Sequence, residues 1–137
     1  MSRIYLDACS IIYLVESASP FHERIVTRLR PHGADPASRL LTSRLSCLEC
    51  RIRPMRDNNE GLLRAYDRFF SADRLVIAEI TAEVVASATT LRARYGFKTP
   101  DAIHLASAIE ASADYFLTGD SSLVRCNEIK VEVLENG

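Results

Sequence analysis

The stretch FKTPDAIHLASAIEASADYFLTGD, residues 97–120, carries two acids at marked positions. Asp101 directly follows Thr-Pro, a pair typical of the first turn of a helix. Asp120 directly follows an apolar run and Thr-Gly. The stretch predicts a helix over residues 99–111 and then a strand over residues 115–118. A helix that leads into a short buried strand is the repeating unit of a parallel sheet.

The rest of the chain repeats this alternation of strands and helices. Further strands are expected at residues 3–6, 40–42, 75–80 and 129–133. Further helices are expected at residues 10–16, 19–30, 43–53, 62–70 and 81–95, the last capped by Thr81 and stopped by Gly96. In the last strand, apolar residues alternate with Lys130 and Glu132, which predicts an edge position. We therefore expect one α/β domain over residues 1–137, with a parallel sheet of about five strands and helices on both faces.

Capping residues and prolines set the expected ends of the first two helices. Ser10 is expected to cap the first helix. Ser19, followed by Pro20 at the first helical position, is expected to begin the second. The sequence PHGADP at residues 31–36 is typical of a loop, so the second helix should end at about Arg30.

The helix expected after Ser43 has an apolar stripe, in which the residues recur at steps of three and four: Leu45, Leu48, Ile52 and Met55. Pro54 removes a backbone hydrogen bond, so this helix should end or kink near Arg53. At 100° per residue Glu49 flanks the stripe and should lean toward the core side of the helix. A carboxylate at a core margin needs a partner, and Arg53, four residues on, is one candidate.

The composition is that of an ordinary soluble globular protein, with 47% hydrophobic and 26% charged residues. No apolar run is long enough to span a membrane and no signal-peptide pattern is present, so we expect a cytoplasmic protein. The net charge of −1 gives no global basic field. Fifteen of the 17 basic residues are Arg, and five of them lie between Arg39 and Arg56 beside one acid. That cluster fits a solvated helix face and an RNA-facing patch about equally well.

Several chemistries lack their motifs. Cys47 and Cys50 have Cys-x-x-Cys spacing, but without a second pair a structural zinc site is not expected. There is no G-x-S-x-G elbow, and Cys9 has no His nearby in sequence. None of the five Gly residues lies in a phosphate-binding or dinucleotide-binding pattern. The acidic side chains remain as the candidates for catalysis.

Four acids are expected near the carboxyl edge of the sheet, where open parallel sheets form their sites: Asp7, Glu49, Asp101 and Asp120. Each has an ordinary explanation. Asp7 can cap the helix after the first strand, and Asp101 can interact favourably with a helix dipole. Asp120 can be a turn residue, and Glu49 can pair with a nearby arginine.

The four acids together are harder to explain in this way. Two unit charges at 4 Å cost about 4 kcal/mol at an effective dielectric constant of about 20. A divalent cation among them would offset the repulsion, and oxygen ligands favour Mg²⁺ or Mn²⁺. Such an ion can bind a phosphodiester oxygen and lower the pKa of an attacking water. The acids therefore favour metal-dependent hydrolysis of phosphodiesters.

Four segments of the chain resemble those of PIN-domain ribonucleases, and most closely those of the VapC toxins of bacterial and archaeal toxin–antitoxin pairs. They are IYLDACS at 4–10, LSCLE at 45–49, YGFKTPDAIHLASA at 95–108 and ADYFLTGD at 113–120. The third segment is the most specific, and the resemblance extends over essentially the whole chain. It implies a PIN-like three-layer sandwich and a Mg²⁺- or Mn²⁺-dependent endoribonuclease that acts as a toxin.

The resemblance also implies roles for individual residues. Asp7 and Asp101 would be the principal metal ligands, and Glu49 and Asp120 would complete the site directly or through water. The hydroxyl groups of Ser10 and Thr118 would orient the carboxylates or their waters. His104 would be structural, three residues after Asp101, which it can brace. The Gly in the Thr-Gly-Asp turn would leave Asp120 as the loosest ligand.

The implied partners are an RNA substrate, a VapB-type antitoxin and a second copy of the chain in a homodimer, with no membrane. The antitoxin would occupy a hydrophobic groove of the early helices, formed by residues 11–15, Ile25, Leu29 and residues 62–70. Three other functions stay open. They are a PIN nuclease of RNA processing without an antitoxin, a PIN-like module that binds RNA or protein without catalysis, and a metal-dependent phosphatase. The phosphatase would normally have an Asp where Cys9 stands.

Overall fold

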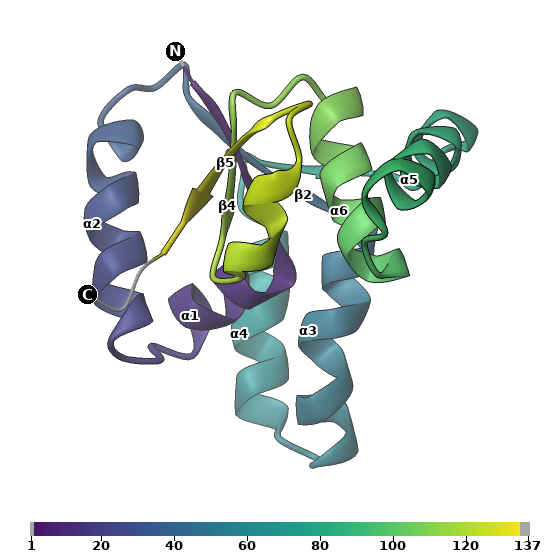
Figure 1. Cartoon of the computed structure of the whole chain (residues 1–137). Coiled ribbons are helices and arrows are strands. Elements are labelled where there is room, and N and C mark those ends of the chain that lie inside the picture. Colours follow the sequence, from purple (N-terminus) through teal and green to yellow (C-terminus); the bar gives the residue numbers. More distant parts are fainter. Residues whose placement is uncertain (1, 135–137) are drawn as a thin grey trace.

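The computed structural model describes residues 2–134, and its centre is a sheet of five strands (Figure 1). The strands are β1 (Arg3–Leu6), β2 (Arg39–Ser43), β3 (Leu75–Ala78), β4 (Tyr115–Thr118) and β5 (Lys130–Val133). All neighbouring strands are parallel, in the order β3-β2-β1-β4-β5. The predicted parallel sheet is confirmed, and β5 lies at an edge as its alternating pattern indicated.

Helices cover both faces of the sheet, which confirms the three-layer α/β sandwich (Figure 1). The helices are α1 (Ala8–Val15), α2 (Phe21–Gly33), α3 (Arg44–Arg56), α4 (Glu60–Phe70), α5 (Ala82–Tyr95), α6 (Thr99–Glu110) and the 3₁₀ helix η1 (Ser121–Arg125). One apolar core lies between the sheet and α5, α6 and η1. The other lies between the sheet and α1, α2, α3 and α4.

Two interior strands, β1 and β4, divide their side chains between these cores. In β1, Tyr5 belongs to the first core, whereas Ile4 and Leu6 belong to the second. In β4, Phe116 stacks on Tyr5 with ring centroids 5.1 Å apart, and Leu117 faces the other way. Successive residues of a strand point to opposite faces, so a strand covered on both sides reads as a continuous apolar run.

The strand order locates the binding edge of the sheet. The chain runs outward from β1 to β2 and β3, and then crosses back to place β4 and β5 on the other side of β1. The order therefore reverses between β1 and β4, and such a switch point is where open parallel sheets bind ligands, beyond the carboxyl ends of their strands. No helix within residues 2–134 is long and apolar enough to cross a membrane.

The capping signals of the sequence are confirmed for α5 and wrong for α1. The Thr81 side chain accepts a hydrogen bond from the backbone of Val84, and Gly96 ends α5 in a left-handed conformation with φ of 73°. The N-cap of α1 is Asp7 and not Ser10, because α1 begins directly after β1. Ser10 is buried inside the helix, and its backbone N–H donates to the Asp7 carboxylate.

The prolines lie at other helix positions than predicted. The N-cap residue of α2 is Pro20 itself and not Ser19. At its other end α2 continues through Pro31 to Gly33, so the expected loop begins later. In the same way α3 does not end near Arg53 but continues through Pro54 to Arg56. Both prolines lie in the last turn of their helix. There, each removes only one hydrogen bond, to a carbonyl four residues earlier.

The apolar stripe of α3 is not in the core. Leu48, Ile52 and Met55 are 55%, 50% and 55% exposed. The face that packs against the domain carries Ser46, Cys50 and Pro54, which are small enough for a close approach. In Figure 1, α3 and α4 form a hairpin that extends beyond the carboxyl edge of the sheet. These three side chains on the outer side of α3 therefore stay exposed among residues 2–134.

Replacing Gly96 by Ala should lower the free energy of unfolding by about 1–2 kcal/mol, because a side chain disfavours the left-handed conformation at this position. Gly33 is the matched control. It lies in a helix, its φ is not positive, and an added Cβ would meet no atom within 4 Å. Gly33→Ala should be neutral or stabilise by up to about 1 kcal/mol. Urea denaturation of both variants tests the pair, and equal destabilisation would contradict this account of α5.

Candidate active site

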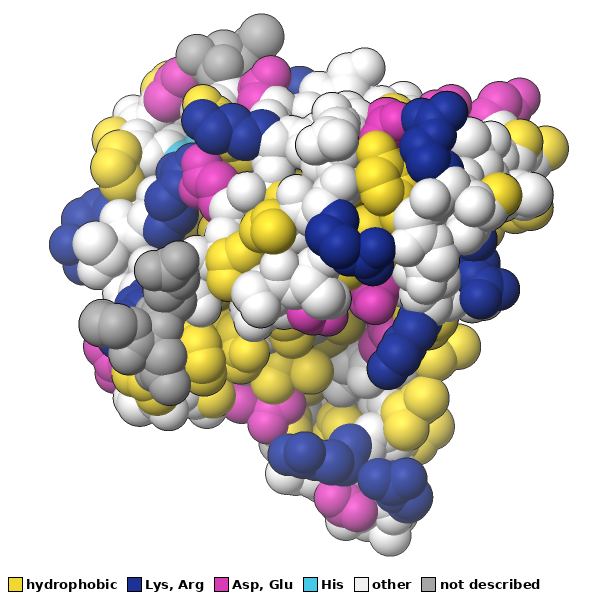
Figure 2. All heavy atoms as spheres, in the orientation of Figure 1, with side chains coloured by type: hydrophobic (Ala, Val, Ile, Leu, Met, Phe, Trp, Pro, Cys, Tyr) yellow, Lys and Arg dark blue, Asp and Glu magenta, His cyan; other side chains and the backbone are white. Residues whose placement is uncertain are grey.

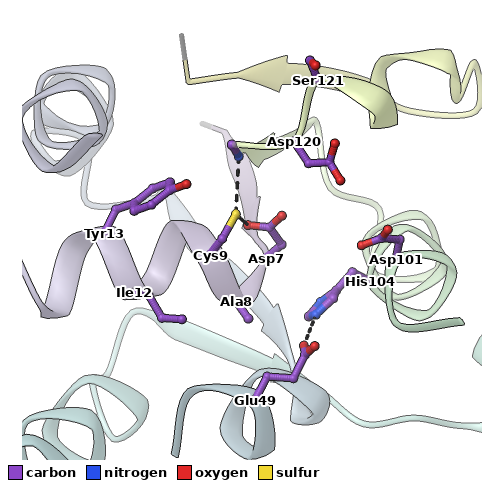
Figure 3. Close-up of a pocket in the computed structure, with 11 residues that line it drawn as sticks. Asp7, Ala8, Cys9, Ile12, Tyr13, Glu49, Asp101, His104, Asp120 and Ser121 are labelled. Atoms are coloured by element: carbon purple, nitrogen blue, oxygen red, sulfur yellow. Dashed lines mark hydrogen bonds and ion pairs between the residues drawn. The ribbon is translucent and has the colours of Figure 1, made fainter. Parts of the chain in front are cut away.

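An open cavity of about 670 Å³ lies at the carboxyl edge of the sheet, at the β1–β4 switch point. Asp7, Glu49, Asp101 and Asp120 all line it (Figure 3). These acids come from the end of β1, from α3, from the first turn of α6 and from the turn after β4. In the described part of the chain, no Lys or Arg lines this cavity. The structure thus brings the four predicted acids into one pocket, and among the described residues His104 is the basic side chain that joins them in its wall.

Asp7 is the most constrained of the four and is only 7% exposed. Its Oδ1 accepts hydrogen bonds from the backbone N–H of Ser10 at 3.0 Å and from the Cys9 thiol at 3.2 Å. Its Oδ2 accepts from the Thr118 hydroxyl at 2.5 Å. Three donors to an ionised acceptor fix the carboxylate without any help from a cation. Asp7 therefore caps α1 and lines the cavity with the same side chain.

The end of β4 is joined to β1 through Thr118. Its hydroxyl donates to Asp7 and accepts from the backbone N–H of Asp120 at 3.0 Å. The carboxylate of Asp120 accepts from the backbone N–H of Ser122 at 2.9 Å and from its hydroxyl at 2.7 Å, so it caps η1. The Ser10 hydroxyl points elsewhere and donates to the Leu117 carbonyl at 2.8 Å. Of the two predicted hydroxyl groups, the structure places that of Thr118 on a cavity carboxylate.

Asp101 shows the electrostatic cost of the arrangement. Burial raises the pKa of this carboxyl above its ordinary value of 3.8, and the charge of Asp120 raises it further. Asp7 and Glu49 act in the same direction, whereas His104 lowers the pKa. A raised pKa means that the folded protein disfavours the ionised form at this position. Asp101 therefore lies in a region of excess negative charge.

Glu49 is paired with a histidine and not with the arginine expected from the sequence. His104 Nε2 lies 2.6 Å from Glu49 Oε1, and His104 Nδ1 lies 2.7 Å from the Tyr5 hydroxyl. Arg53 approaches Glu16 instead, at 3.8 Å. His104 was expected to brace Asp101, three residues before it. The hydrogen bonds show that it braces Glu49, 55 residues away in sequence.

The donor chemistry of the cavity fits a hard divalent cation, but the ligand geometry is not assembled. All four acids supply oxygen donors, and the charges of Asp120, Asp7 and Glu49 add to burial in raising the pKa of Asp101. Within residues 2–134, however, no three His, Cys, Asp or Glu side chains lie close enough together to hold an ion as they stand.

Several residues of the cavity wall were not assigned to the site from the sequence, among them Cys9, Tyr13 and Gly119. Burial, together with the charge of Asp7, raises the pKa of the Cys9 thiol to about 12, so this thiol is a hydrogen-bond donor and a poor nucleophile. Tyr13 follows Asp7 by six residues on α1, and its ring stacks on Phe21. No periodic pattern distinguishes these residues from core positions, since their place depends on how α1 meets the β4 turn.

Position 119 requires Gly because a side chain would collide with Tyr13, and not because the backbone adopts a conformation that only Gly allows. Its φ is not positive, but a Cβ added here would lie 2.6 Å from the Tyr13 hydroxyl oxygen. The close approach of Tyr13 to the Thr-Gly-Asp turn therefore excludes every other residue at this position unless the ring moves. The turn is packed rather than loose, and Asp120 is held further by its bonds to Ser122.

Gly119→Ala should destabilise the protein by about 1–3 kcal/mol, the usual range for overpacking. Tyr13→Phe removes the hydroxyl oxygen and should recover part of that loss in the double variant, because the next contacts are at 3.0 Å and 3.2 Å. A double-mutant cycle by urea denaturation measures the coupling. Additive effects would show that the two residues do not meet in this way.

Asp101→Asn should stabilise the metal-free protein at pH 7. The folded-state pKa of Asp101 lies above 3.8, so the folded protein loses stability as the pH rises through that pKa. The gain from Asn should be complete above the folded-state pKa and should vanish below the ordinary value of 3.8, where the carboxyl is protonated in both the folded and the unfolded protein. Asp7→Ala is the contrasting variant and should cost about 1–2 kcal/mol through loss of the α1 cap. Thermal melts across this pH range, in EDTA, would refute the assignment if Asp101→Asn were destabilising at pH 7.

Solved structures with the same fold come from toxin–antitoxin complexes. A chain of VapBC2 from Rickettsia felis, bound to a promoter DNA fragment, matches with a TM-score of 0.78 at 17% identity, over 96% of this chain and 99% of that one. A chain of DNA-bound VapBC from Salmonella typhimurium matches with a TM-score of 0.73 at 16% identity, over 98% and 100%. At these identities the likeness shows the fold.

A third structure is that of VapC20 from Mycobacterium tuberculosis, described as a sarcin-ricin loop cleaving toxin. It matches with a TM-score of 0.65 at 16% identity, over 82% of this chain and 86% of that one. No curated protein sequence matches the chain. The PIN domain family matches residues 4–128, which include all four cavity acids, and the chain therefore belongs to the PIN domain family.

Proposed function

We propose that this protein is a Mg²⁺- or Mn²⁺-dependent endoribonuclease and the toxin of a VapBC-type toxin–antitoxin pair. The observation that carries the proposal is the cavity at the β1–β4 switch point, where acids from four separate segments meet with no Lys or Arg among the described lining residues. Membership of the PIN domain family supports nuclease chemistry. One relative in fold is described as an RNA-cleaving toxin, and others come from VapBC complexes.

Asp7 and Asp101 would hold the ion, with Glu49 and Asp120 completing its environment directly or through water. A bound divalent cation would supply Lewis acidity toward a phosphodiester oxygen and a lowered pKa for the attacking water. The protein's own contribution is preorganisation. Asp7 is oriented by three donors and Asp120 by two, so neither has to be ordered when substrate arrives.

The surface offers apolar area for a VapB-type antitoxin. Ile11 and Ile25 are fully buried and belong to the core, so they cannot form the groove expected for them. Half-buried apolar side chains on α1, α2 and α4 remain available: Ile12, Leu14, Val15, Leu29, Leu62, Phe69 and Phe70. Figure 2 shows hydrophobic side chains gathered over the region of α1 and α4. We propose this surface for the antitoxin.

A homodimer has a different candidate surface, on the outer side of α3. Leu48, Ile52 and Met55 are exposed there. Leu48 also shares a shallow hollow with Leu45 and Ile80, at the start of α3 and just after β3. This stripe has helical periodicity and is exposed in the described part of the chain, so a second copy of the protein would account for it.

Purified protein should cleave single-stranded RNA in Mg²⁺ or Mn²⁺ and should lose this activity in EDTA. Asp7→Asn and Asp101→Asn should each reduce the cleavage rate by more than the roughly 10–100-fold that loss of an outer metal-site partner costs. Asn at position 7 keeps an oxygen that can cap α1, so the fold should survive. Asp67→Asn is the matched control, since Asp67 is an exposed acid paired with Arg51 away from the cavity.

Two results would count against the nuclease proposal: cleavage that persists in EDTA, or full activity of Asp7→Asn. The toxin assignment has its own test. Expression of the wild-type chain in bacteria should arrest growth, whereas expression of Asp7→Asn should not. An active nuclease that leaves growth unaffected would favour a function in RNA processing without an antitoxin.

A further inference from the structure

A buried histidine beside the cavity has no part in the function proposed so far. His104 is 4% exposed and hydrogen-bonded through both ring nitrogens, on one side to the Tyr5 hydroxyl at 2.7 Å and on the other to Glu49 at 2.6 Å. Tyr5 is fully buried in β1, His104 lies in α6 and Glu49 lies in α3. The three side chains form one line from the interior of the sheet to the cavity wall.

The chemistry of the partners fixes the direction of one bond. An ionised carboxylate can only accept, so Nε2 of His104 must carry the hydrogen that is shared with Glu49 Oε1. Nδ1 then faces the Tyr5 hydroxyl, which can donate to it. Tyr5 cannot shift, because its ring is stacked on Phe116 in the core. The imidazole therefore has a fixed orientation and presents one N–H to the cavity side.

Glu49 needs such a partner more than the other acids do. A glutamate has three side-chain torsions, and ordering one costs up to about 1.5–2 kcal/mol in conformational entropy. Asp7 and Asp120 are short side chains held by neighbouring backbone N–H groups. Glu49 is the long acid of the cavity, it is 29% exposed, and its hydrogen bond among the described residues is the one to His104. That bond occupies Oε1 and leaves Oε2 for the cavity.

We propose that His104 is a positioning residue that holds the Glu49 carboxylate in the geometry the reaction uses, with Tyr5 fixing the orientation of the imidazole. The inference rests on the proposed function in that the reaction is metal-dependent RNA cleavage. A buried imidazole needs partners for its nitrogens in any role. What distinguishes His104 is that one of its two partners, Glu49, is an acid of the cavity. Figure 3 shows His104 lying between Asp101 and Glu49, with its ring directed at Glu49.

Two substitutions of His104 distinguish a role in positioning Glu49 from a role in core packing alone. His104→Gln places an amide N–H near the position of Nε2 and should keep the bond to Glu49. His104→Asn places its amide near Nδ1, can still reach Tyr5 and should lose Glu49. We expect His104→Asn to lower kcat and to weaken Mn²⁺ binding by about 10–100-fold, the usual effect of removing a partner of a metal-site residue. His104→Gln should stay within a few-fold of wild type, and KM for RNA should change little in either variant.

His32 provides the control for loss of a buried, doubly hydrogen-bonded histidine. It is 7% exposed and bonds to Ser2 and to the Arg39 carbonyl, at the opposite edge of the sheet. His32→Asn should lower the melting temperature without changing kcat or Mn²⁺ affinity per folded molecule. Tyr5→Phe extends the test, since Tyr5 does not line the cavity. It should lower kcat and Mn²⁺ affinity as His104→Asn does, but by a smaller factor. Equal losses in His104→Gln and His104→Asn, or no loss in either, would overturn the proposal.

A measurement independent of nuclease activity completes the design. Imidazole ¹⁵N NMR of the metal-free wild-type protein should show Nε2 of His104 protonated, and the Nε2 signal should shift in Glu49→Gln. An unprotonated Nε2 would overturn the proposal whatever the RNA assay gives. Suppose that wild type shows the expected NMR signature, that Mn²⁺ affinity falls in His104→Asn but not in His104→Gln, and that wild type cleaves no RNA. The proposed function has then failed, and the positioning of Glu49 stands.

Discussion

The carboxylate of Asp7 holds together the part of the fold on which the cavity depends. It accepts hydrogen bonds from Ser10 at the start of α1 and from Thr118 at the end of β4, a residue 111 positions away in sequence. These bonds join the two strands between which the strand order reverses. A side chain that caps a helix is usually sufficiently explained by the cap. Here the cap is also what fixes an acid at the switch point, so the structural and functional interpretations of Asp7 do not compete.

The four acids of the cavity repel one another, and hydrogen bonds from neighbouring residues offset this repulsion only in part. Asp7 has three donors, Asp120 caps η1, and Glu49 is bonded to His104. The pKa of Asp101 is raised first by burial and then by the charges of Asp120, Asp7 and Glu49. A cation at this position would relieve the repulsion that the protein's own donors leave. Within residues 2–134 the four acids do not form a compact ligand set.

Particular elements show why the sequence predicted the fold correctly but did not always predict which face of a helix is buried. Continuous apolar runs gave the buried strands, and Thr81 and Gly96 gave the ends of α5, because these signals act within a few residues. The stripe on α3 was read as core and is exposed. Periodicity shows that a helix has an apolar face but not what covers that face. In α3 the opposite side packs against α4 and α1, and the α3–α4 hairpin projects beyond the sheet (Figure 1).

The sequence by itself determined the alternation of strands and helices, the parallel sheet, the family and the four acids that line one cavity, because each of these follows from local patterns or from short motifs. Only the tertiary structure decided the partners of those acids. His104 is hydrogen-bonded to Glu49, 55 residues away in sequence, and Thr118 to Asp7, 111 residues away. Tyr13 lies against Gly119. These contacts depend on how separate helices dock on the sheet, and no spacing along a single chain encodes the distance between side chains on different elements.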